Sequence, residues 1–253
     1  MIGKSRTLSL LLLFSEEDNS LSAEEIAQRL GATLSTTYRD LKKLRELGLV
    51  ETVPGERFIL GGQISILDRI ARLGTPLLKA SIDEMERLAK VTGVTVTLTR
   101  LYFDSIIGLG HVEGDRNVSI GYERGQVVPL FYGCTGKSIL GALPWRQLKR
   151  IFEANTNAIR EAGLGGSWDA FLGTVRTWDR DSFLWTEGEI NPDNIAVATA
   201  VLGADAVPLG SLTLIIRRRD ISLFDRSQIE TELMRSRRKI QSVIAESAMS
   251  HAT

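Results

Sequence analysis

Cysteine and histidine are nearly absent from this chain. Its 253 residues include one cysteine, Cys134, and two histidines, His111 and His251. A single cysteine forms no disulfide within the chain, which is typical of a reducing compartment and predicts the cytoplasm. The three residues are too few for a Cys/His zinc site, and no Gly-x-Ser-x-Gly segment accompanies His111. We therefore expect no metal, no other cofactor and no Ser-His-Asp hydrolase.

An excess of charge of one sign and a long apolar segment are also missing. The chain has 31 Lys and Arg against 31 Asp and Glu, so a surface that binds nucleic acid must be a local patch. The apolar run 8–14 follows Lys4 and Arg6, as in a signal peptide, but the acidic segment 15–18 comes next without a small-residue cleavage site. No stretch approaches the roughly 20 apolar residues that span a membrane. We expect neither secretion nor membrane insertion, and interpret 8–14 as part of a buried helix.

The first 62 residues have the order of elements typical of a winged helix-turn-helix. A chain of 253 residues predicts two domains. One helix is predicted over 5–16, and the capping-box pair Ser22 and Glu25 begins a second helix that ends at Gly31. The remaining elements are a third helix over 35–47 and two strands, 49–53 and 57–60, which form the wing. Such a module places its third helix in the major groove of double-stranded DNA.

The predicted third helix has an apolar and a polar face. Helical spacing directs Tyr38, Leu41, Leu44 and Leu47 inward. Hydroxyl groups bond phosphates or base edges, arginine pairs with guanine, and lysine neutralises phosphate. The candidate DNA-binding residues are the hydroxyl and basic side chains of this helix and one basic residue of the wing: Ser35, Thr36, Thr37, Arg39, Lys42, Lys43 and Arg57. A solvated helix without a DNA partner has a similar pattern, but the elements around this one favour DNA binding.

The charge balance of this domain indicates that it binds DNA as an oligomer. Residues 1–62 hold eight Lys and Arg against nine Asp and Glu. Because phosphate contacts dominate affinity, a monomer would bind DNA weakly at physiological salt. We therefore predict a homodimer or homotetramer that presents paired helices to a pseudo-palindromic operator.

The rest of the chain predicts a linker over 63–74 and a second domain over 75–253. A linker helix is expected at 63–73. Within the second domain, Val94, Val96 and Leu98 alternate with threonines, which is typical of a strand. The other expected elements are strands near 105–112, 118–122, 127–131, 195–202 and 209–217, and helices at 77–91, 136–142, 145–154, 167–180 and 222–248. This is an α+β domain around an antiparallel sheet.

Three segments resemble the IclR (isocitrate lyase regulator) family of bacterial regulators. They are LSTTYRDLKKLRELGLV at 34–50, LFYGCTGKSIL at 130–140 and NPDNIAVATAV at 191–201. The order of elements agrees with that family over nearly the whole chain. The resemblance implies a winged helix-turn-helix, a linker helix and a GAF-like effector-binding domain, in dimers or tetramers that respond to small organic or aromatic acids. This chain departs from the family pattern at Phe131 or Tyr132, where histidine is common, and at Ile215, where serine is common.

A candidate effector pocket follows from the loop at 133–136 and from this resemblance. Backbone amides at the start of a helix bind carboxylates. By resemblance, the pocket also takes residues from neighbouring strands and an acidic residue near 187–189. The candidate effector-binding residues are Leu130, Cys134, Thr135, Gly136, Glu187, Glu189, Ala196 and Thr213. The alternative for the apolar residues and the threonines is a purely structural place in the core.

Two other functions remain open at this point. One is a regulator like those of the DeoR family, which senses a sugar phosphate; it requires a C-terminal domain of alternating strands and helices, and no such run is present. The other is an enzyme that uses Cys134 as a nucleophile near a helix start, where a thiol pKa is often lowered. His111 is the one plausible base for that thiol, so we expect no enzyme.

Overall fold

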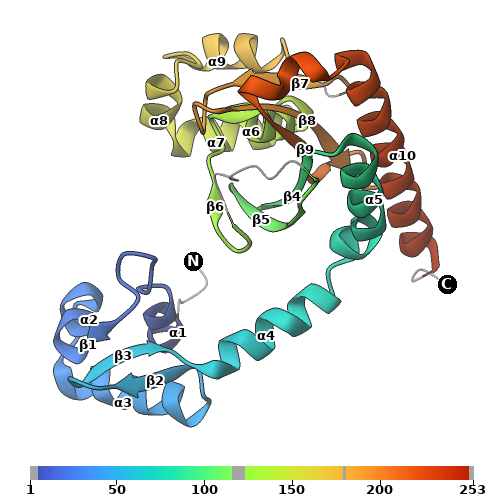
Figure 1. The fold of residues 1–253 in the computed structure, drawn as a ribbon. Coiled ribbons are helices and arrows are strands. Elements are labelled where there is room, and N and C mark those ends of the chain that lie inside the picture. Colours follow the sequence, from blue (N-terminus) through green and yellow to red (C-terminus); the bar gives the residue numbers. More distant parts are fainter. Residues whose placement is uncertain (1–4, 116–122, 179–180, 251–253) are drawn as a thin grey trace. The chain divides into compact units, whose positions relative to one another are not determined.

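The computed structural model describes residues 5–115, 123–178 and 181–250, in two compact units, 1–75 and 76–253 (Figure 1). The strand expected at 118–122 lies outside the described residues. None of the helices in the described ranges is long and apolar enough to cross a membrane.

The first unit is a winged helix-turn-helix followed by one long helix. Its elements in chain order are α1 (Arg6–Leu11), β1 (Leu21–Ser22), α2 (Ala23–Leu30), α3 (Leu34–Glu46), β2 (Val50–Val53), β3 (Arg57–Leu60) and α4 (Gly62–Leu73). The three strands pair in the order β1-β3-β2. Leu10, Ile26, Leu41, Leu44 and Phe58 form the core under the helices, as their spacing predicts. The predicted capping box is present: Ser22 Oγ accepts from the amide of Glu25, and the Glu25 carboxylate accepts from the amide of Ser22.

Two boundaries in this unit differ from the prediction. The first helix ends at Leu11 and not at residue 16, because Ser15 Oγ accepts a hydrogen bond from the amide of Asp18 and closes a turn there. Strand β1 was not predicted, because a strand of two residues is too short to show an alternating pattern. It pairs with β3, where Leu21 lies opposite Phe58. The amide of Gly62 donates to Glu51, which fixes the start of α4 to strand β2.

The second unit is built on a six-stranded antiparallel sheet. The strands are β4 (Thr95–Tyr102), β5 (Ser105–Val112), β6 (Val127–Val128), β7 (Leu184–Glu187), β8 (Asn194–Leu202) and β9 (Pro208–Arg217), in the order β6-β5-β4-β9-β8-β7. The helices are α5 (Pro76–Thr92), α6 (Gly133–Ala142), α7 (Trp145–Ala154), α8 (Thr156–Glu161), α9 (Trp168–Val175) and α10 (Arg226–Ser250), with a 3-10 helix at Arg218–Leu223. The α+β class and the antiparallel sheet predicted from the sequence are confirmed.

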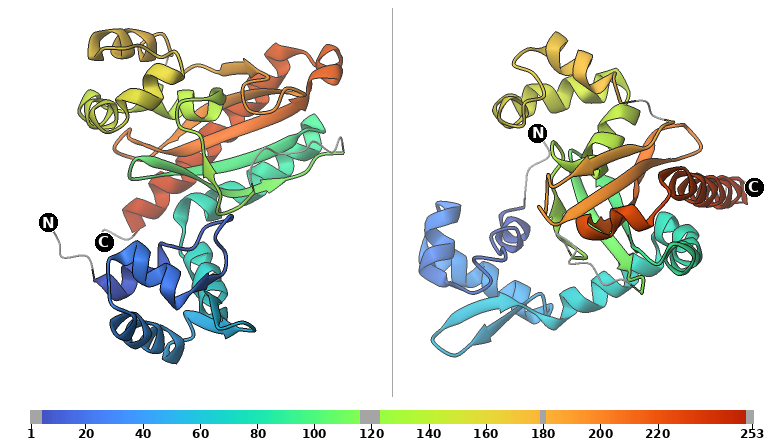
Figure 2. Two further views of the ribbon diagram at one scale, coloured as in Figure 1. Left: turned by 90° about the vertical axis from the view of Figure 1, so that its left-hand side faces the viewer. Right: turned by 45° about the horizontal axis from the view of Figure 1, so that its top comes forward.

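The two faces of this sheet have different chemistry. Helices α5 and α10 cover one face, where Val96, Leu98 and Leu214 contribute to a large apolar core (Figure 2). Helix α6 packs on the other face against β8 and β9. That second face presents Thr95, Thr97 and Thr99 from β4, because side chains alternate between the faces of a strand. A buried polar floor therefore lies beneath α6.

Several elements of this unit were predicted with the wrong bounds or missed. Helix α6 begins at Gly133, where φ is +72°, and not at 136. Helix α9 ends at Val175, and the last helix begins at Arg226 because residues 218–223 form the 3-10 helix. Helix α8 and the edge strand β7 were not predicted. Both are short, so their pattern is too brief to stand out from the loops around them.

Candidate functional site

One face of α3 is exposed and rich in polar and basic side chains. Ser35, Arg39, Lys42 and Lys43 are exposed, and Thr36 is partly so. Thr33 caps the helix: its Oγ1 accepts from the amide of Thr36 at 3.3 Å. Five of the predicted DNA-binding residues therefore lie on or beside a surface that can enter a groove.

The inward face of α3 differs in part from the predicted one, since Leu41 and Leu44 are buried as predicted but Tyr38 and Leu47 are not. Thr37 is buried together with Asp40, Leu41 and Leu44, so it does not lie on the exposed face, which corrects its assignment. Tyr38 and Leu47, which were expected to face inward, are 45% and 64% exposed. The inward positions are 37, 40, 41 and 44, and the aromatic ring of Tyr38 joins the outer face.

A buried carboxylate holds α3 against α1. Asp40 accepts hydrogen bonds from Arg6 Nε at 2.8 Å and from Thr7 Oγ1 at 3.0 Å. Burial alone would raise the pKa of Asp40, but the hydrogen bonds from Arg6 and Thr7 and the charge of Arg6 outweigh it and hold the pKa below its ordinary value. Sequence reasoning missed this contact because the partners lie 33 and 34 residues apart. An acidic residue at an inward helical position was the available signal.

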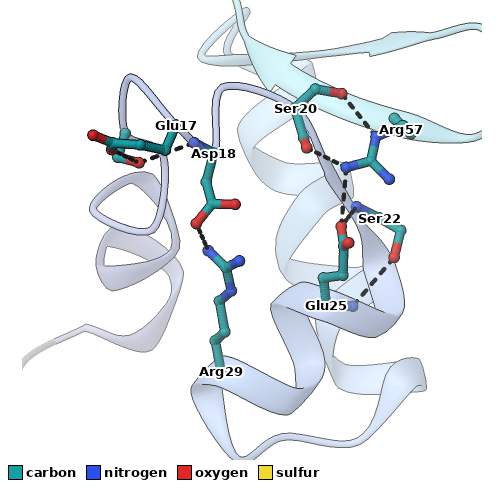
Figure 3. Close-up of polar contacts among 8 residues, drawn as sticks. Glu17, Asp18, Ser20, Ser22, Glu25, Arg29 and Arg57 are labelled. Atoms are coloured by element: carbon teal, nitrogen blue, oxygen red, sulfur yellow. Dashed lines mark hydrogen bonds and ion pairs between the residues drawn. The ribbon is translucent and has the colours of Figure 1, made fainter.

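Arg57 of the wing is engaged within the domain (Figure 3). Its Nε donates to Ser20 Oγ at 3.0 Å, one of its Nη groups donates to the Ser20 carbonyl, and the same nitrogen lies 3.2 Å from the Glu25 carboxylate. Glu25 is also the capping-box residue of α2. In this conformation Arg57 ties β3 to the start of α2, and does not extend from the wing as expected for a groove contact.

The second unit contains a pocket where α6 meets the sheet and the loop between β7 and β8. The cavity measures about 40 Å³. The described residues that line it come from α6, from β6 to β9 and from the loop 188–193: Val128, Tyr132, Gly133, Cys134, Thr135, Thr186, Gly188, Glu189, Ile190, Asn191, Asn194, Ala196, Thr213 and Ile215. Five predicted effector residues line this pocket, namely Cys134, Thr135, Glu189, Ala196 and Thr213.

The other three predicted effector residues lie elsewhere in the described structure. Leu130 packs in the apolar cluster beneath α7 and α9. Gly136 faces the carbonyl of Leu130, and a Cβ there would lie 2.2 Å from that oxygen, so this glycine serves close packing. Glu187 pairs with Arg218 at the surface, where both side chains are half exposed. These three assignments are therefore corrected.

The amides at the start of α6 are already bound by side chains of the protein. Gly133 N donates to Glu189 Oε2 at 2.9 Å, and Cys134 N donates to Thr186 Oγ1 at 3.1 Å. Lys137 Nζ, one turn along α6, lies 2.6 Å and 2.7 Å from the two oxygens of Glu189. The sequence predicted an effector carboxylate at this helix start; in the structure the carboxylate of Glu189 occupies it.

Hydroxyl groups form the floor of the site. Thr135 Oγ1 and Thr213 Oγ1 are 2.9 Å apart, as are Ser138 Oγ and Ser211 Oγ. Thr95 lies directly opposite Ile215 across β4 and β9. Its Oγ1 is buried and has no hydrogen-bond partner among the described residues.

The chemistry of Cys134 does not fit a nucleophile. Its thiol is 1% exposed, and burial raises its pKa to about 11 although Thr186 and backbone hydrogen bonds oppose that shift. At neutral pH the group is therefore a protonated thiol in the wall of the pocket. Among the described residues, no group of three His, Cys, Asp or Glu side chains is placed to hold a metal ion.

Both units match sequence models of one family. Residues 5–54 match the IclR helix-turn-helix domain, and residues 73–240 match the C-terminal domain of bacterial transcriptional regulator IclR. The chain belongs to the IclR family. The resemblance found in the sequence is thereby confirmed, and the DeoR-like alternative is set aside because the C-terminal sheet is antiparallel and matches the IclR model.

Known members of the IclR family show how far the likeness extends. The chain is 26% identical over 138 residues to HTH-type transcriptional regulator KdgR of Escherichia coli, an alignment that spans 54% of this chain and 52% of KdgR. The chain thus spans about half the length of this curated relative.

Solved structures share the fold over nearly the full chain. One of a putative IclR regulator from Silicibacter sp. TM1040 has a TM-score of 0.76 at 22% identity, with 94% of each chain covered. An IclR homologue from Microbacterium hydrocarbonoxydans, complexed with 4-hydroxybenzoate, has a TM-score of 0.73 at 16% identity, with 94% of this chain and 97% of that chain covered.

Proposed function

We propose that this chain is a DNA-binding transcriptional regulator of the cytoplasm whose operator affinity is modulated by a small organic or aromatic acid. The match of both units to the two IclR domain models carries this proposal. The first unit supplies the DNA-binding surface and the second supplies the effector pocket.

The exposed face of α3 is the proposed reading surface. Ser35 and Arg39 lie in its first half, where a recognition helix contacts base edges, and Lys42 and Lys43 are placed for phosphates. Thr36 flanks this face, and Arg57 supports it from within the domain. The equal numbers of acidic and basic residues in the chain favour two copies on a pseudo-palindromic operator, because one copy neutralises few phosphates.

The pocket beside α6 is the proposed effector site. Its lining combines the apolar side chains of Val128, Ala196 and Ile215 with the hydroxyls of Thr135 and Thr213, as is typical of a site for a small organic molecule. The positive end of α6 and the ammonium of Lys137 favour an anionic ligand. The 4-hydroxybenzoate complex of the Microbacterium hydrocarbonoxydans homologue supports an acid of that class.

A binding selection tests the DNA half of this proposal. The full chain is used to enrich duplexes from a random library, and the enriched sequence is then titrated with Arg39→Ala and with Arg29→Ala. Arg29 is a matched control because it is an arginine of α2, outside α3, whose guanidinium pairs with Asp18. We expect Arg39→Ala to lose about 1–3 kcal/mol of specific binding free energy, which is roughly 5- to 160-fold in affinity, while Arg29→Ala binds like wild type. Equal binding by Arg39→Ala would show that α3 does not read the DNA.

A thermal-shift panel tests the effector half. Acetate, pyruvate, benzoate and 4-hydroxybenzoate are compared with the corresponding uncharged amides. An acid at about 100 times its dissociation constant stabilises the native protein by about 2.7 kcal/mol, which gives a measurable rise in Tm. Rises with acids and not with amides would support the proposal. Equal rises with both would indicate a neutral effector, and no rise with any compound would contradict an effector of this class.

A further inference from the structure

The effector pocket holds a carboxylate of its own at the position best suited to an anionic ligand. We propose that Glu189 is an internal competitor of the effector, and that an incoming carboxylate displaces it from the start of α6 and from Lys137. This inference rests on the proposed effector function and assigns Glu189 as the residue that sets how tightly an acid binds.

The contacts of Glu189 are those of a bound ligand. Its two carboxylate oxygens accept from the backbone amide of Gly133 and from the ammonium of Lys137, at 2.6–2.9 Å. The donors come from α6, whereas Glu189 comes from a loop 52 to 56 residues further along the chain. Charge-assisted hydrogen bonds of this length are strong. An effector carboxylate therefore gains the same donors only where Glu189 gives them up.

The size of the cavity also requires a displacement. The cavity volume of about 40 Å³ holds a few water molecules. It is far smaller than a cavity of about 150 Å³ that accepts benzene. Glu189 and Ile190 are part of its wall, and a Cβ at Gly133 would lie only 3.0 Å from Ile190 Cγ1. Outward movement of the loop that carries both residues would open the pocket over Gly133.

The loop 188–193 is built so that such a movement disturbs little of the core. It joins β7, which is the edge strand of the sheet in the described order, to β8 (Figure 1). Gly188 begins the loop at φ +70°, and its amide donates to the carbonyl of Asn194, so the loop is closed at its base. The Glu189 side chain is 31% exposed, and its carboxylate would return to water on release.

A hydroxyl group without a partner among the described residues lies next to the wall of the pocket. Thr95 and Ile215 are direct partners on β4 and β9, so their side chains lie on one face of the sheet, and Ile215 lines the cavity. Thr95 Oγ1 is fully buried and finds no partner among the described residues. A buried hydroxyl without a partner is unfavourable. If opening of the pocket displaces Ile215, a polar group of a ligand would satisfy this hydroxyl.

The competition has a quantitative consequence. We call the open state the conformation in which Glu189 has left Gly133 and Lys137. If a fraction f of the molecules is in this state, the apparent dissociation constant of an acid is its intrinsic value divided by f. Removing the Glu189 carboxylate raises f toward one. Acids should therefore bind a variant without this carboxylate at least tenfold more tightly than they bind wild type.

Chemical rescue with acetate tests the subsite directly. The full chain is prepared as wild type, Glu189→Ala, Glu189→Gln and Glu187→Ala, and each is melted in increasing acetate at pH 7.5, with chloride at equal ionic strength as reference. Glu187→Ala is the matched control, since Glu187 is a nearby glutamate that pairs with Arg218 and does not contribute to the cavity wall among the described residues. Glu189→Gln keeps the shape of the side chain if the alanine variant does not fold.

We expect acetate to raise the Tm of Glu189→Ala with a saturable dependence, and benzoate to bind Glu189→Ala and Glu189→Gln at least tenfold more tightly than wild type. Glu187→Ala should respond like wild type. An absence of rescue, or benzoate binding that is unchanged or weaker in the Glu189 variants, would overturn the inference. If wild type binds acids but Glu189→Ala gains nothing, the effector proposal stands and this inference fails. If acetate rescues Glu189→Ala but no acid affects wild type at any concentration, the subsite stands and the effector proposal fails.

Discussion

Arg57 of strand β3 and Glu25 of helix α2 lie 3.2 Å apart, and the same glutamate closes the capping box of α2. One carboxylate thus couples the wing to the start of the helix that precedes α3. The Ser20 contacts of Arg57 strengthen the same link (Figure 3). We therefore predict that Arg57 affects DNA binding through the position of the wing.

The first prediction separates this positioning role from a phosphate contact. A residue that neutralises a phosphate contributes about one to the salt dependence of DNA affinity, measured as the slope of log K against log salt. We expect Arg57→Ala to lower the Tm of the protein and leave that slope unchanged. Lys42→Ala, the control, should reduce the slope by about one. A reduced slope in Arg57→Ala would show that Arg57 contacts DNA.

The second prediction concerns the buried Asp40. Removing its charge in Asp40→Asn weakens the bonds from Arg6 and Thr7, at an expected cost of about 1–3 kcal/mol in unfolding free energy. Because the folded-state pKa of Asp40 lies below the ordinary value of 3.8, its contribution is present above that value and is lost as the pH falls through the lowered pKa. Denaturant unfolding at pH 7 and in acid measures both effects. Asp18→Asn, which removes an exposed partner of Arg29, should leave the denaturant midpoint of unfolding unchanged. An equal loss of stability in both variants would contradict the stabilising role assigned to Asp40.

The third prediction concerns the reactivity of Cys134. Since its pKa is raised to about 11, the thiol should react slowly with iodoacetamide at pH 7.5 and rapidly once the protein is unfolded. Burial of the neutral thiol favours the folded state below the ordinary pKa of 9.0, and this contribution is lost as the pH rises through the folded-state value. Mass spectrometry of the labelled protein provides the measurement. Rapid labelling of the native protein would reopen a nucleophilic role.

The fourth prediction compares two buried threonines of the sheet face beneath α6, Thr95 and Thr213. Thr95→Val removes a hydroxyl that has no partner among the described residues, so the Tm without ligand should stay constant or rise. Thr213→Val breaks the hydrogen bond to Thr135 and leaves the buried Thr135 hydroxyl without this partner. We expect the free energy of unfolding to fall by about 1 kcal/mol. Thermal melts of both variants test the pair. A larger loss in Thr95→Val than in Thr213→Val would mean that the Thr95 hydroxyl has a partner in the folded protein.

The long periodic segments of this chain were predictable from the sequence, and the short ones were not. Helices α2 and α7 and strand β5 were placed with the bounds that the structure gives. A capping box and a terminal glycine define α2 locally, and β5 follows β4 as its hairpin partner. Strands β1 and β7 have two and four residues, and their pairing is decided by distant partners. The inward face of α3 was predicted only in part, because Tyr38 has an apolar ring, whereas the small Thr37 and the paired Asp40 occupy the inner face.

The composition of the pocket was predictable in part. Cys134, Thr135, Ala196 and Thr213 followed from the family resemblance and from a helix start rich in glycine. The contacts of Glu189 with Gly133 and Lys137 could not be predicted, because they join positions 56 and 52 residues apart in the chain. A carboxylate in a loop is usually solvated, and only the fold brings this one to the amide of Gly133. Thr95 was seen as part of a strand, but its missing partner depends on the packing around it.

Linkage between the two units tests the central claim most directly. The affinity of the full chain for its selected duplex is measured by fluorescence anisotropy, without acid and with the acid that gives the largest thermal shift, at a concentration that saturates the pocket. The account predicts a change in the dissociation constant of at least fivefold, corresponding to a coupling of about 1 kcal/mol or more. The same acid should have no effect on non-specific DNA. A saturating acid that leaves the affinity for the selected duplex unchanged would contradict the account, because the pocket would then have no part in regulating DNA binding.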